Sequence, residues 1–349
     1  MADLLVFITG STGFIGSHVV DVTLKAGYRV RLSIRNPEQA EPIRQRYPEY
    51  ASKIETVVIP DISKQESFKK ALENVTYIFH LASPMPGNGS DIRTDYVNPA
   101  VQGTEAILYA ALEFPKIRKV VITSSVLALL PVDVLTAGKE VSIKGEVATS
   151  LYNGSRLTRY LTDNIGKTIP VDLDMSFPED LTGHGMKYAA SKILAHEATR
   201  DFLDKNNPQY ILITLHPTFV LGHSLIQESA KDIGGINGLF WLSLFSEKPL
   251  IPTAWVHVRD VADVHLKALT APVESGKEFL LSAPTFSWEE GISFIKTHYP
   301  ALSCKFEAPV EEQWKLDVTN AENTFGIQWK NMETMIQDVI EQQLTFQKE

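Results

Sequence analysis

A tyrosine and a lysine four residues apart are the first pair in this sequence whose types and spacing suit proton transfer. Tyr188 and Lys192 would lie one turn apart on the same face of a helix. There the lysine ammonium can lower the pKa of the phenol from about 10 toward a working range. Such a phenol can protonate a carbonyl oxygen that gains negative charge. Taken alone, the same spacing also fits a half-buried packing tyrosine beside a solvated lysine.

A glycine-rich turn near the start of the sequence suits a dinucleotide. Residues 9–16, TGSTGFIG, place Gly10, Gly13 and Gly16 three apart between a short apolar run and a helical pattern. Glycine lets the backbone turn sharply and bring its N–H groups close to a pyrophosphate at the helix N-terminus. No Gly-Lys-Ser/Thr follows at the spacing of a P-loop, so nucleotide hydrolysis is disfavoured.

These residues need a scaffold, and the hydrophobic pattern predicts alternating strands and helices. The run 4–8 is continuously apolar, which is typical of a strand buried on both faces, and the helical pattern over 14–26 stops at Gly27. The alternation predicts an α/β fold: a Rossmann doubly wound parallel sheet with a smaller, interleaved C-terminal substrate lobe. Strands are expected at 29–34, 56–60, 77–82, 119–123, 211–216 and 278–282.

Domain boundaries follow from where this alternation stops. We expect a dinucleotide-binding domain over 1–222, to which 253–282 returns. After Gly222 the pattern is irregular and rich in aromatic residues, so 223–252 and 283–349 are assigned to the substrate lobe.

Composition excludes several classes of protein. The 349 residues, 44% of them hydrophobic, suffice for a large core. A net charge of −9 would repel nucleic acid and anionic lipid, and no apolar stretch reaches the roughly 20 residues that cross a bilayer. The single cysteine, Cys304, excludes an intramolecular disulfide, and residues 1–10 do not resemble a signal peptide. We expect a cytoplasmic protein with no nucleic-acid or membrane partner, and the oligomeric state is unknown from sequence.

Metal and hydrolase chemistry are not expected. His196 and Glu197 begin an HExxH-like string, but Arg200 stands where the second histidine is needed. His257 and His265 lie eight apart without a local third ligand, and His257 is expected to pack or hydrogen-bond structurally. There is no G-x-S-x-G elbow.

Several strings in chain order resemble the extended short-chain dehydrogenase/reductases. The most branch-specific is 96–104, YVNPAVQGT, which resembles the dihydroflavonol reductase, cinnamoyl-CoA reductase and yeast methylglyoxal reductase branch. The others are TGSTGFIG at 9–16, DI at 61–62, HLAS at 80–83, TSS at 123–125, YAASK at 188–192, HPTFVLG at 216–222 and WVHVRDVA at 255–262.

The resemblance implies a role for each matching residue. Tyr188 would be the proton donor, Lys192 would assist it and hold the nicotinamide ribose, and Ser125 would hydrogen-bond the substrate oxygen, with Ser124 as the other candidate for that role. The implied contacts to an NADP(H) cofactor are Gly10, Thr12, Gly13, Phe14, Ile15, Gly16, Arg35, Asp61, Ile62, Leu81, Ala82, Ser83, Tyr188, Lys192, Pro217 and Val220.

The end of the second strand favours NADP over NAD. No Asp or Glu stands there to receive a ribose 2′-hydroxyl, whereas Arg35 can pair with a 2′-phosphate. This chain lacks the nearby lysine that many relatives use as a second phosphate contact.

An insertion separates the predicted catalytic residues. The 62 residues between Ser125 and Tyr188 exceed what relatives in this branch have, and the extra segment spans 136–174. It is either a surface elaboration or a lid that borders the substrate. Apolar residues near the expected site indicate a greasy carbonyl substrate: Pro84, Met85, Val126, Phe219 and Trp241.

The sequence thus predicts NADPH-dependent reduction of a ketone or aldehyde in a mainly apolar small molecule, with the proton from Tyr188. The alternatives are a nucleotide-sugar epimerase or dehydratase, which would use the same Tyr and Lys, and a noncatalytic dinucleotide-sensing protein.

Overall fold

The computed structural model describes residues 4–83, 89–133, 141–144, 149–150, 169–305 and 314–347. Its contacts divide the chain into two compact, interleaved units. The first unit holds 1–137, 167–216 and 265–279, and the second holds 138–166, 217–264 and 280–349. Each unit is described below by itself.

The first unit is built on a seven-stranded sheet of order β11-β8-β5-β4-β1-β2-β3. The pairs from β8 through β3 are parallel, with Val6 opposite Val30 on one side and Tyr77 on the other. Strands β1, β4 and β5 are buried along their whole length, as their continuous apolar runs predict. The strands are β1 Leu5–Thr9, β2 Arg29–Ile34, β3 Ile54–Val58, β4 Tyr77–His80, β5 Lys119–Thr123, β8 Ile211–Pro217 and β11 Lys277–Leu281.

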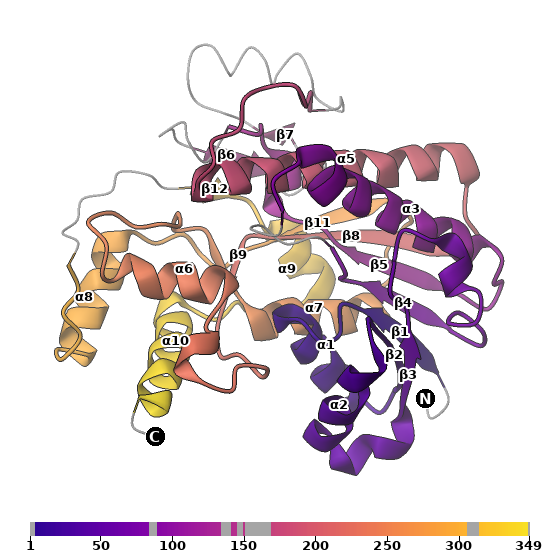
Figure 1. Ribbon diagram of the computed structural model, residues 1–349, viewed down its shortest axis with the longest axis horizontal. Helices are drawn as coiled ribbons and strands as arrows, with labels where there is room; N and C mark the ends of the chain where they lie inside the picture. The colour runs from indigo at the N-terminus through magenta and orange to yellow at the C-terminus, as the bar shows by residue number, and fades with distance from the viewer. Residues whose placement is uncertain are drawn as a thin grey trace. The chain divides into compact units, whose positions relative to one another are not determined.

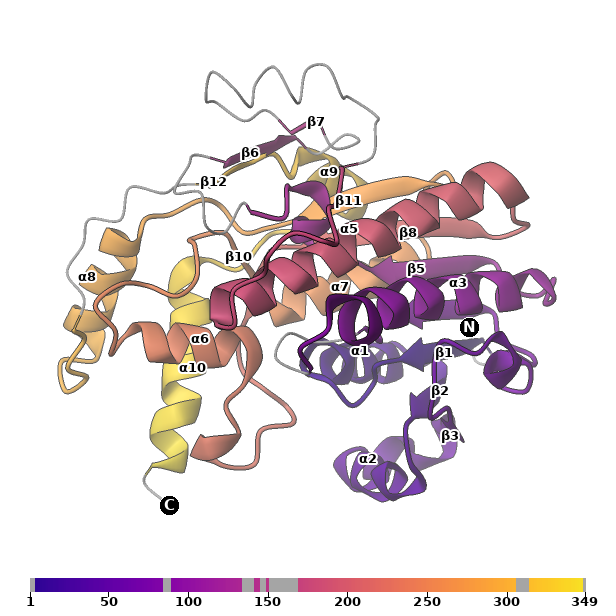
Figure 2. The ribbon, with the colours of Figure 1, turned by 45° about the horizontal axis from the view of Figure 1, so that its top comes forward.

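Helices cover both faces of this sheet. Helices α3 and α5 lie side by side over one face, and α1 lies over the other (Figures 1 and 2). The helices are α1 Phe14–Lys25, α2 Ala40–Arg46, α3 Asn98–Leu112 and α5 Leu181–Asn206, with a π-helix at Ile92–Val97 and short 3-10 turns at Pro37–Gln39, Pro48–Lys53, Gln65–Phe68 and η5, Val126–Leu129. The predicted Rossmann doubly wound sheet is confirmed.

The strand order places the expected ligand crevice. The chain runs outward from β1 to β2 and β3, then returns to pair β4 with the other edge of β1. In open α/β sheets, ligands bind beyond the carboxyl ends of the strands at such a reversal. Strand β1 ends at Thr9, where the glycine-rich turn begins, and β4 ends at His80, where the segment HLAS begins. Both segments therefore lie at the carboxyl ends of the two strands beside this reversal.

The second unit packs around tryptophans. Phe240 lies 5.4 Å from Trp255, and Trp255 lies 5.1 Å from Trp288, measured between ring centroids. Both indole N–H groups donate to backbone carbonyls, which removes the cost of burying them. The helices are α6 Gly235–Ser243, α7 Val258–Ala268, whose last turn enters the first unit, α8 Trp288–His298, α9 Thr319–Phe325 and α10 Met332–Phe346, with a 3-10 turn at Ala230–Asp232.

Two small sheets belong to the second unit. Strand β9 (Phe219–Leu221) pairs in parallel with β10 (Trp255–His257). Strand β6 (Val141–Lys144) lies between β12 (Trp314–Leu316) and β7 (Thr149–Ser150), parallel to the first and antiparallel to the second. Part of the segment expected as an insertion over 136–174 therefore forms strands with β12.

The unit boundaries differ from those expected from the sequence. Because β9 pairs with β10, residues 217–222 and 253–264 fall in the second unit instead of the dinucleotide-binding domain. Residues 138–166 fall there too, in keeping with the β6–β12 pairing. Within the part of the chain that the structure describes, no helix is long and apolar enough to cross a membrane.

Candidate functional site

The glycine turn closes tightly between β1 and α1. Gly10 has a φ of +70°, and a Cβ added there would lie 2.8 Å from the Ala82 backbone nitrogen. A Cβ on Gly16 would lie 2.0 Å from the Gly10 carbonyl oxygen. Any side chain at either position would collide with backbone, so this shape requires glycine. Helix α1 begins at Phe14 with no acidic residue in its first turn, which suits an anion.

Thr9 fastens this turn to the end of β4. Its hydroxyl oxygen accepts hydrogen bonds from the Leu81 and Ala82 amides at 3.2 and 3.1 Å. Its own proton is therefore left for His80 Nδ1, 2.9 Å away. Burial lowers the pKa of His80 to about 3, which keeps the ring neutral and able to accept. The two predicted cofactor segments, 10–16 and 81–83, are thereby held against each other.

The residues predicted beside the adenosine half lie at the ends of β2 and β3. Arg35 is exposed directly after β2, its backbone N–H donates to Gln39 at 2.7 Å, and its guanidinium forms no ion pair with the described residues. Asp61 is exposed, and hydrogen bonds from Ser63 lower its pKa. The Ile62 side chain packs so closely on Gly103 that a Cβ there would lie 2.9 Å from it. Arg35 is thus free to meet a phosphate.

Helix α5 presents the predicted catalytic pair. The Asp180 carboxylate caps it by accepting from the Gly183 N–H at 2.9 Å. Tyr188 and Lys192 follow one turn apart, and the Lys192 Nζ lies 5.4 Å from the centroid of the Tyr188 ring. Lys192 is 5% exposed.

Burial shifts both groups toward their neutral forms. It raises the pKa of Tyr188 to about 12, against a hydrogen bond from Ser125 that lowers it. It lowers the pKa of Lys192 to about 8. The lowered phenol pKa expected from the sequence is therefore wrong for the protein without ligand, because desolvation outweighs the hydrogen bond from Ser125. At pH 7 the phenol holds its proton, as a proton donor must.

Ser125 is presented by the turn that follows β5. The Ser124 N–H donates to the Leu215 carbonyl at 2.8 Å, which extends the β5–β8 ladder by one residue. Ser125 then caps η5, its Oγ accepting from the Leu127 N–H at 3.2 Å. Ser125 is close enough to Tyr188 for a hydrogen bond from its hydroxyl to lower the pKa of that phenol. All three predicted catalytic side chains thus converge within the first unit.

A small cavity adjoins Lys192. Its volume is about 20 Å³, and Lys192, His196, Ser124, Ala82 and Ser83 are among its lining residues. Such a volume holds about one water molecule. The cavity thus lies between the HLAS segment and α5.

The sequence analysis missed a cluster beside Ser125. His196, His216 and Glu278 bring their ligand atoms within 4.8 Å of one another. The three residues come from α5, β8 and β11, so no local spacing reveals them. The sequence offers one indirect sign: His196 lies on the same predicted helix as Tyr188 and Lys192, and His216 and Glu278 lie on predicted strands.

The predicted substrate residues fall in different places. Val126 is 1% exposed and offers no surface to a ligand, because η5 turns it into the core; that prediction is wrong for this structure. Pro84 and Met85 lie outside the described residues. In the second unit, Phe219 packs edge-on against Trp314, and Trp241 packs against Phe245.

The remaining second-unit residues are structural in character. The predicted cofactor contacts Pro217 and Val220 are both buried there. The His257 Nε2 lies 2.9 Å from the Asp338 Oδ2, and its Nδ1 accepts from the Arg259 N–H at 3.0 Å. His257 therefore hydrogen-bonds structurally, as its isolation in the sequence indicates.

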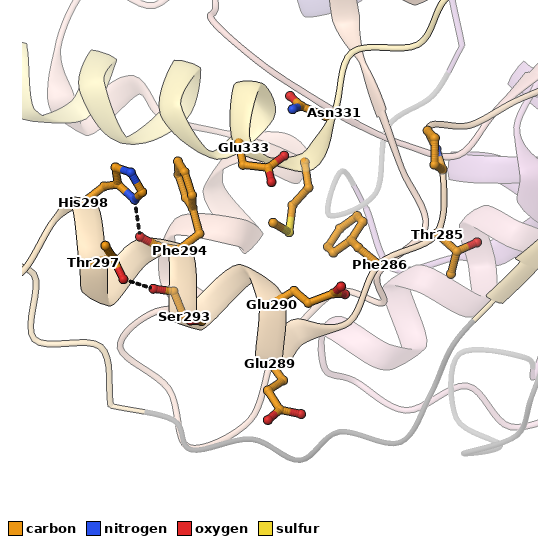
Figure 3. A pocket seen from close by; sticks show the side chains of 12 residues that line it. Thr285, Phe286, Glu289, Glu290, Ser293, Phe294, Thr297, His298, Asn331 and Glu333 are labelled. Atoms are coloured by element: carbon orange, nitrogen blue, oxygen red, sulfur yellow. Dashed lines mark hydrogen bonds between the residues drawn. The ribbon is translucent and has the colours of Figure 1, made fainter.

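A larger hollow of about 690 Å³ lies on the second unit, between α8 and the start of α10 (Figure 3). Glu289, Glu290 and Glu333 line it, and none of the predicted site residues does. Three carboxylates would repel a diphosphate. The hollow is therefore unsuited to the cofactor or to a nucleotide sugar.

Known proteins resemble the whole chain. The sequence model of the NAD dependent epimerase/dehydratase family matches residues 6–150. Ketoreductase sphI of Aspergillus fumigatus is 33% identical over 351 residues, which cover 99% of each chain. Aldehyde reductase 2 of Sporidiobolus salmonicolor is 26% identical over 96% of this chain and 95% of its own. The crystal structure of yeast methylglyoxal/isovaleraldehyde reductase Gre2 complexed with NADPH shares the fold, with a TM-score of 0.77 and 24% identity over 99% of both chains.

Proposed function

Because the chain belongs to the NAD-dependent epimerase/dehydratase family of extended short-chain dehydrogenase/reductases, we propose that it reduces a ketone or aldehyde carbonyl in a mainly apolar small molecule with NADPH. The observation that carries the proposal is the convergence of Tyr188, Lys192 and Ser125 in one unit, with the phenol protonated. Relatives named ketoreductase and aldehyde reductase support this chemistry.

The first unit fits the dinucleotide. Gly10 and Gly16 leave a cradle that any Cβ would fill, and the N-terminus of α1 offers its N–H groups to the pyrophosphate. Arg35 would pair with the 2′-phosphate, and Asp61 and Ile62 would lie beside the adenine. The segment 81–83 would line the nicotinamide side. When bound, NADPH supplies the hydride.

The protein's own side chains manage the proton. Tyr188 donates its phenolic proton to the carbonyl oxygen as negative charge grows there. Ser125 donates a hydrogen bond that stabilises the same charge. The Lys192 ammonium then faces the phenolate that Tyr188 becomes and lowers its energy. The lysine also holds the nicotinamide ribose in this proposal.

The two alternatives have less support. An epimerase would need a site for a nucleoside diphosphate, and the large hollow of the second unit is acidic. A dinucleotide sensor would not need a tyrosine, a lysine and a serine on one site. The setting that we propose is cytoplasmic, without a nucleic-acid partner, in keeping with the single cysteine and the net charge of −9.

The test is turnover by the purified protein. Loss of NADPH absorbance should accompany aryl ketones, diketones or aliphatic aldehydes, with one alcohol formed per NADPH consumed. NADH should be a poorer donor. Conversion of a UDP-sugar without net NADPH consumption, and no reaction with any carbonyl, would establish the epimerase instead.

A further inference from the structure

Two histidines and a carboxylate meet in the first unit beside the Ser125 turn. The Glu278 Oε2 lies 3.2 Å from the His196 Nε2 and 3.3 Å from the His216 Nε2. The exposed fractions of these side chains are 14%, 7% and 1%, respectively. On its other side, the His216 ring places Nδ1 3.1 Å from the Ser125 carbonyl oxygen. A chain of hydrogen bonds therefore leads from Glu278 to the backbone of a predicted catalytic residue.

The partners of His216 fix where its protons lie. The Ser125 carbonyl can only accept, so His216 Nδ1 carries a proton. On the opposite side of the ring, Nε2 faces the Glu278 Oε2 at 3.3 Å. His216 is therefore held between two oxygen atoms, the Ser125 carbonyl and the Glu278 carboxylate.

The Glu278 carboxylate is held by both histidines. Burial would raise the pKa of Glu278, but hydrogen bonds from His196 and His216 outweigh it and hold that pKa well below its usual range. Burial lowers the pKa of His196, so its ring is neutral and donates through Nε2. Its Nδ1 has no hydrogen-bond partner among the described residues. Glu278 is thus an ionised carboxylate whose burial is compensated by hydrogen bonds.

We propose that His216 is a positioning residue for Ser125, with its ring held between the Ser125 carbonyl and the Glu278 carboxylate. The inference rests on the proposed function, because Ser125 matters as a donor to the substrate oxygen. The Ser125 carbonyl accepts from the His216 Nδ1 and from the Ala128 N–H at 3.0 Å, while its Oγ accepts from the Leu127 N–H. Backbone and side chain of Ser125 are thereby fixed together, and the hydroxyl proton is directed at Tyr188.

A divalent cation on the same three atoms is the competing arrangement. A three-ligand metal site needs a further position for water. The small cavity reaches His196, but neither His216 nor Glu278 is among its lining residues. This cavity therefore offers no water position next to His216 or Glu278.

Two substitutions of His216 separate the two ends of its ring. His216→Asn keeps an N–H near the position of Nδ1 and loses the reach to Glu278. His216→Gln keeps an N–H near the position of Nε2 and loses the donor to Ser125. A purely structural role in the ion pair predicts that Asn is the more damaging, whereas positioning of Ser125 predicts that Gln is.

Two readouts apply to each variant. Hydrogen exchange of the peptide that covers 124–130 needs no substrate, and His216→Gln should speed the exchange of the Leu127 and Ala128 amides while His216→Asn should not. In turnover with NADPH, His216→Gln should lower kcat about tenfold at an unchanged NADPH Kd, because a misplaced donor loses alignment. His216→Asn should stay within about threefold of the parent. Greater damage by Asn, or equal effects of both, would overturn the proposal.

Further measurements test the proposal when turnover or folding fails. If no carbonyl is reduced by the parent protein, the proposed function fails, and the exchange measurement still decides whether His216 holds Ser125. If His216→Gln does not fold, His216→Phe keeps a ring at this position without the Nδ1 donor, and unchanged exchange over 124–130 in that variant would overturn the inference. One equivalent of zinc in the purified parent protein, lost in Glu278→Gln, would show that the three side chains bind a metal and would overturn the hydrogen-bonded arrangement.

Discussion

The Lys192 Nζ stands 5.4 Å from the centre of the Tyr188 ring, one helical turn away on the same face of α5. Lys192 is buried and Tyr188 is half-buried, and each pKa moves toward the neutral form, to about 12 for the phenol and about 8 for the ammonium. At neutral pH the pair therefore consists of a protonated phenol and a poorly solvated ammonium group. A phenolate formed during reaction would gain the full attraction of that cation.

Removing the phenol tests the proton donor. Tyr188→Phe deletes the hydroxyl but little volume, so the fold and NADPH affinity should be retained. Without a positioned acid, kcat should fall by roughly 10²- to 10⁴-fold. Steady-state turnover on a confirmed carbonyl, with cofactor affinity from fluorescence titration, measures both. Full turnover by this variant would show that the proton comes from another group.

The buried lysine should make stability depend on pH. Its pKa is about 8 when folded and 10.5 when unfolded. Below pH 8 the folded state bears the whole cost of a buried charge, on the order of 3 kcal/mol at about 1.4 kcal/mol per pKa unit. Between pH 8 and 10.5 the unfolded state binds more protons, so stability rises and the cost disappears.

Lys192→Met should therefore raise the melting temperature of the cofactor-free protein at pH 7, and the gain should vanish near pH 10.5. Thermal unfolding of both proteins across this range gives the comparison. Lys205, an exposed lysine on the same helix, supplies the control, because Lys205→Met should give no such pH-dependent difference. A gain that is equal at pH 7 and 10.5 would show that packing, not charge, explains it.

Cofactor choice should depend on one cation. Arg35→Ala removes the group that can pair with the 2′-phosphate, so NADPH affinity should fall about tenfold while NADH affinity stays unchanged. Dissociation constants for both cofactors, with Arg44→Ala as an exposed control, check this. Equal affinities for NADPH and NADH in the parent protein would already refute it.

The local parts of this site could be predicted from the sequence. The turn at 9–16, the strand run before it and the Tyr188–Lys192 spacing each depend on residues close together in the chain, where pattern and geometry correspond. Burial does not follow from spacing, and this is why the direction of the Tyr188 pKa was predicted wrongly. Only the folded packing shows how strongly desolvation raises the pKa of this phenol.

The non-local parts could not be predicted. His216 and Glu278 are 62 residues apart, and only the β8–β11 neighbourhood brings them together. The same holds for β6, which finds its partner β12 far along the chain. The domain boundary differs for a related reason. Strands β9 and β10 pair with each other, so the residues that carry them fall in the second unit.

Residues 138–166, the part of the expected insertion that lies in the second unit, offer a test of that unit. Replacing them with a short Gly/Ser linker removes β6 and β7 and leaves β12 without its strand partner. NADPH affinity should stay nearly unchanged, because the predicted cofactor contacts lie elsewhere, while the KM for the carbonyl substrate should change. Unchanged kinetics across a substrate panel would favour a surface elaboration over a lid.

The glycine cradle gives the sharpest contrast. Gly16→Ala would place a methyl carbon 2.0 Å from the Gly10 carbonyl oxygen, so the turn must open or the helix must shift. Either change moves the N–H groups that would meet the pyrophosphate, and NADPH binding should be lost even where the variant folds.

Gly291→Ala in α8 is the matched control, since its nearest neighbours, Ile336 and Met332, lie 3.6 Å away at ordinary contact distance. Alanine is the better helix former, so that variant should bind NADPH normally and melt no lower than the parent. Calorimetric titration with NADPH on both variants decides the matter: normal affinity in Gly16→Ala would mean that the cofactor does not use this turn.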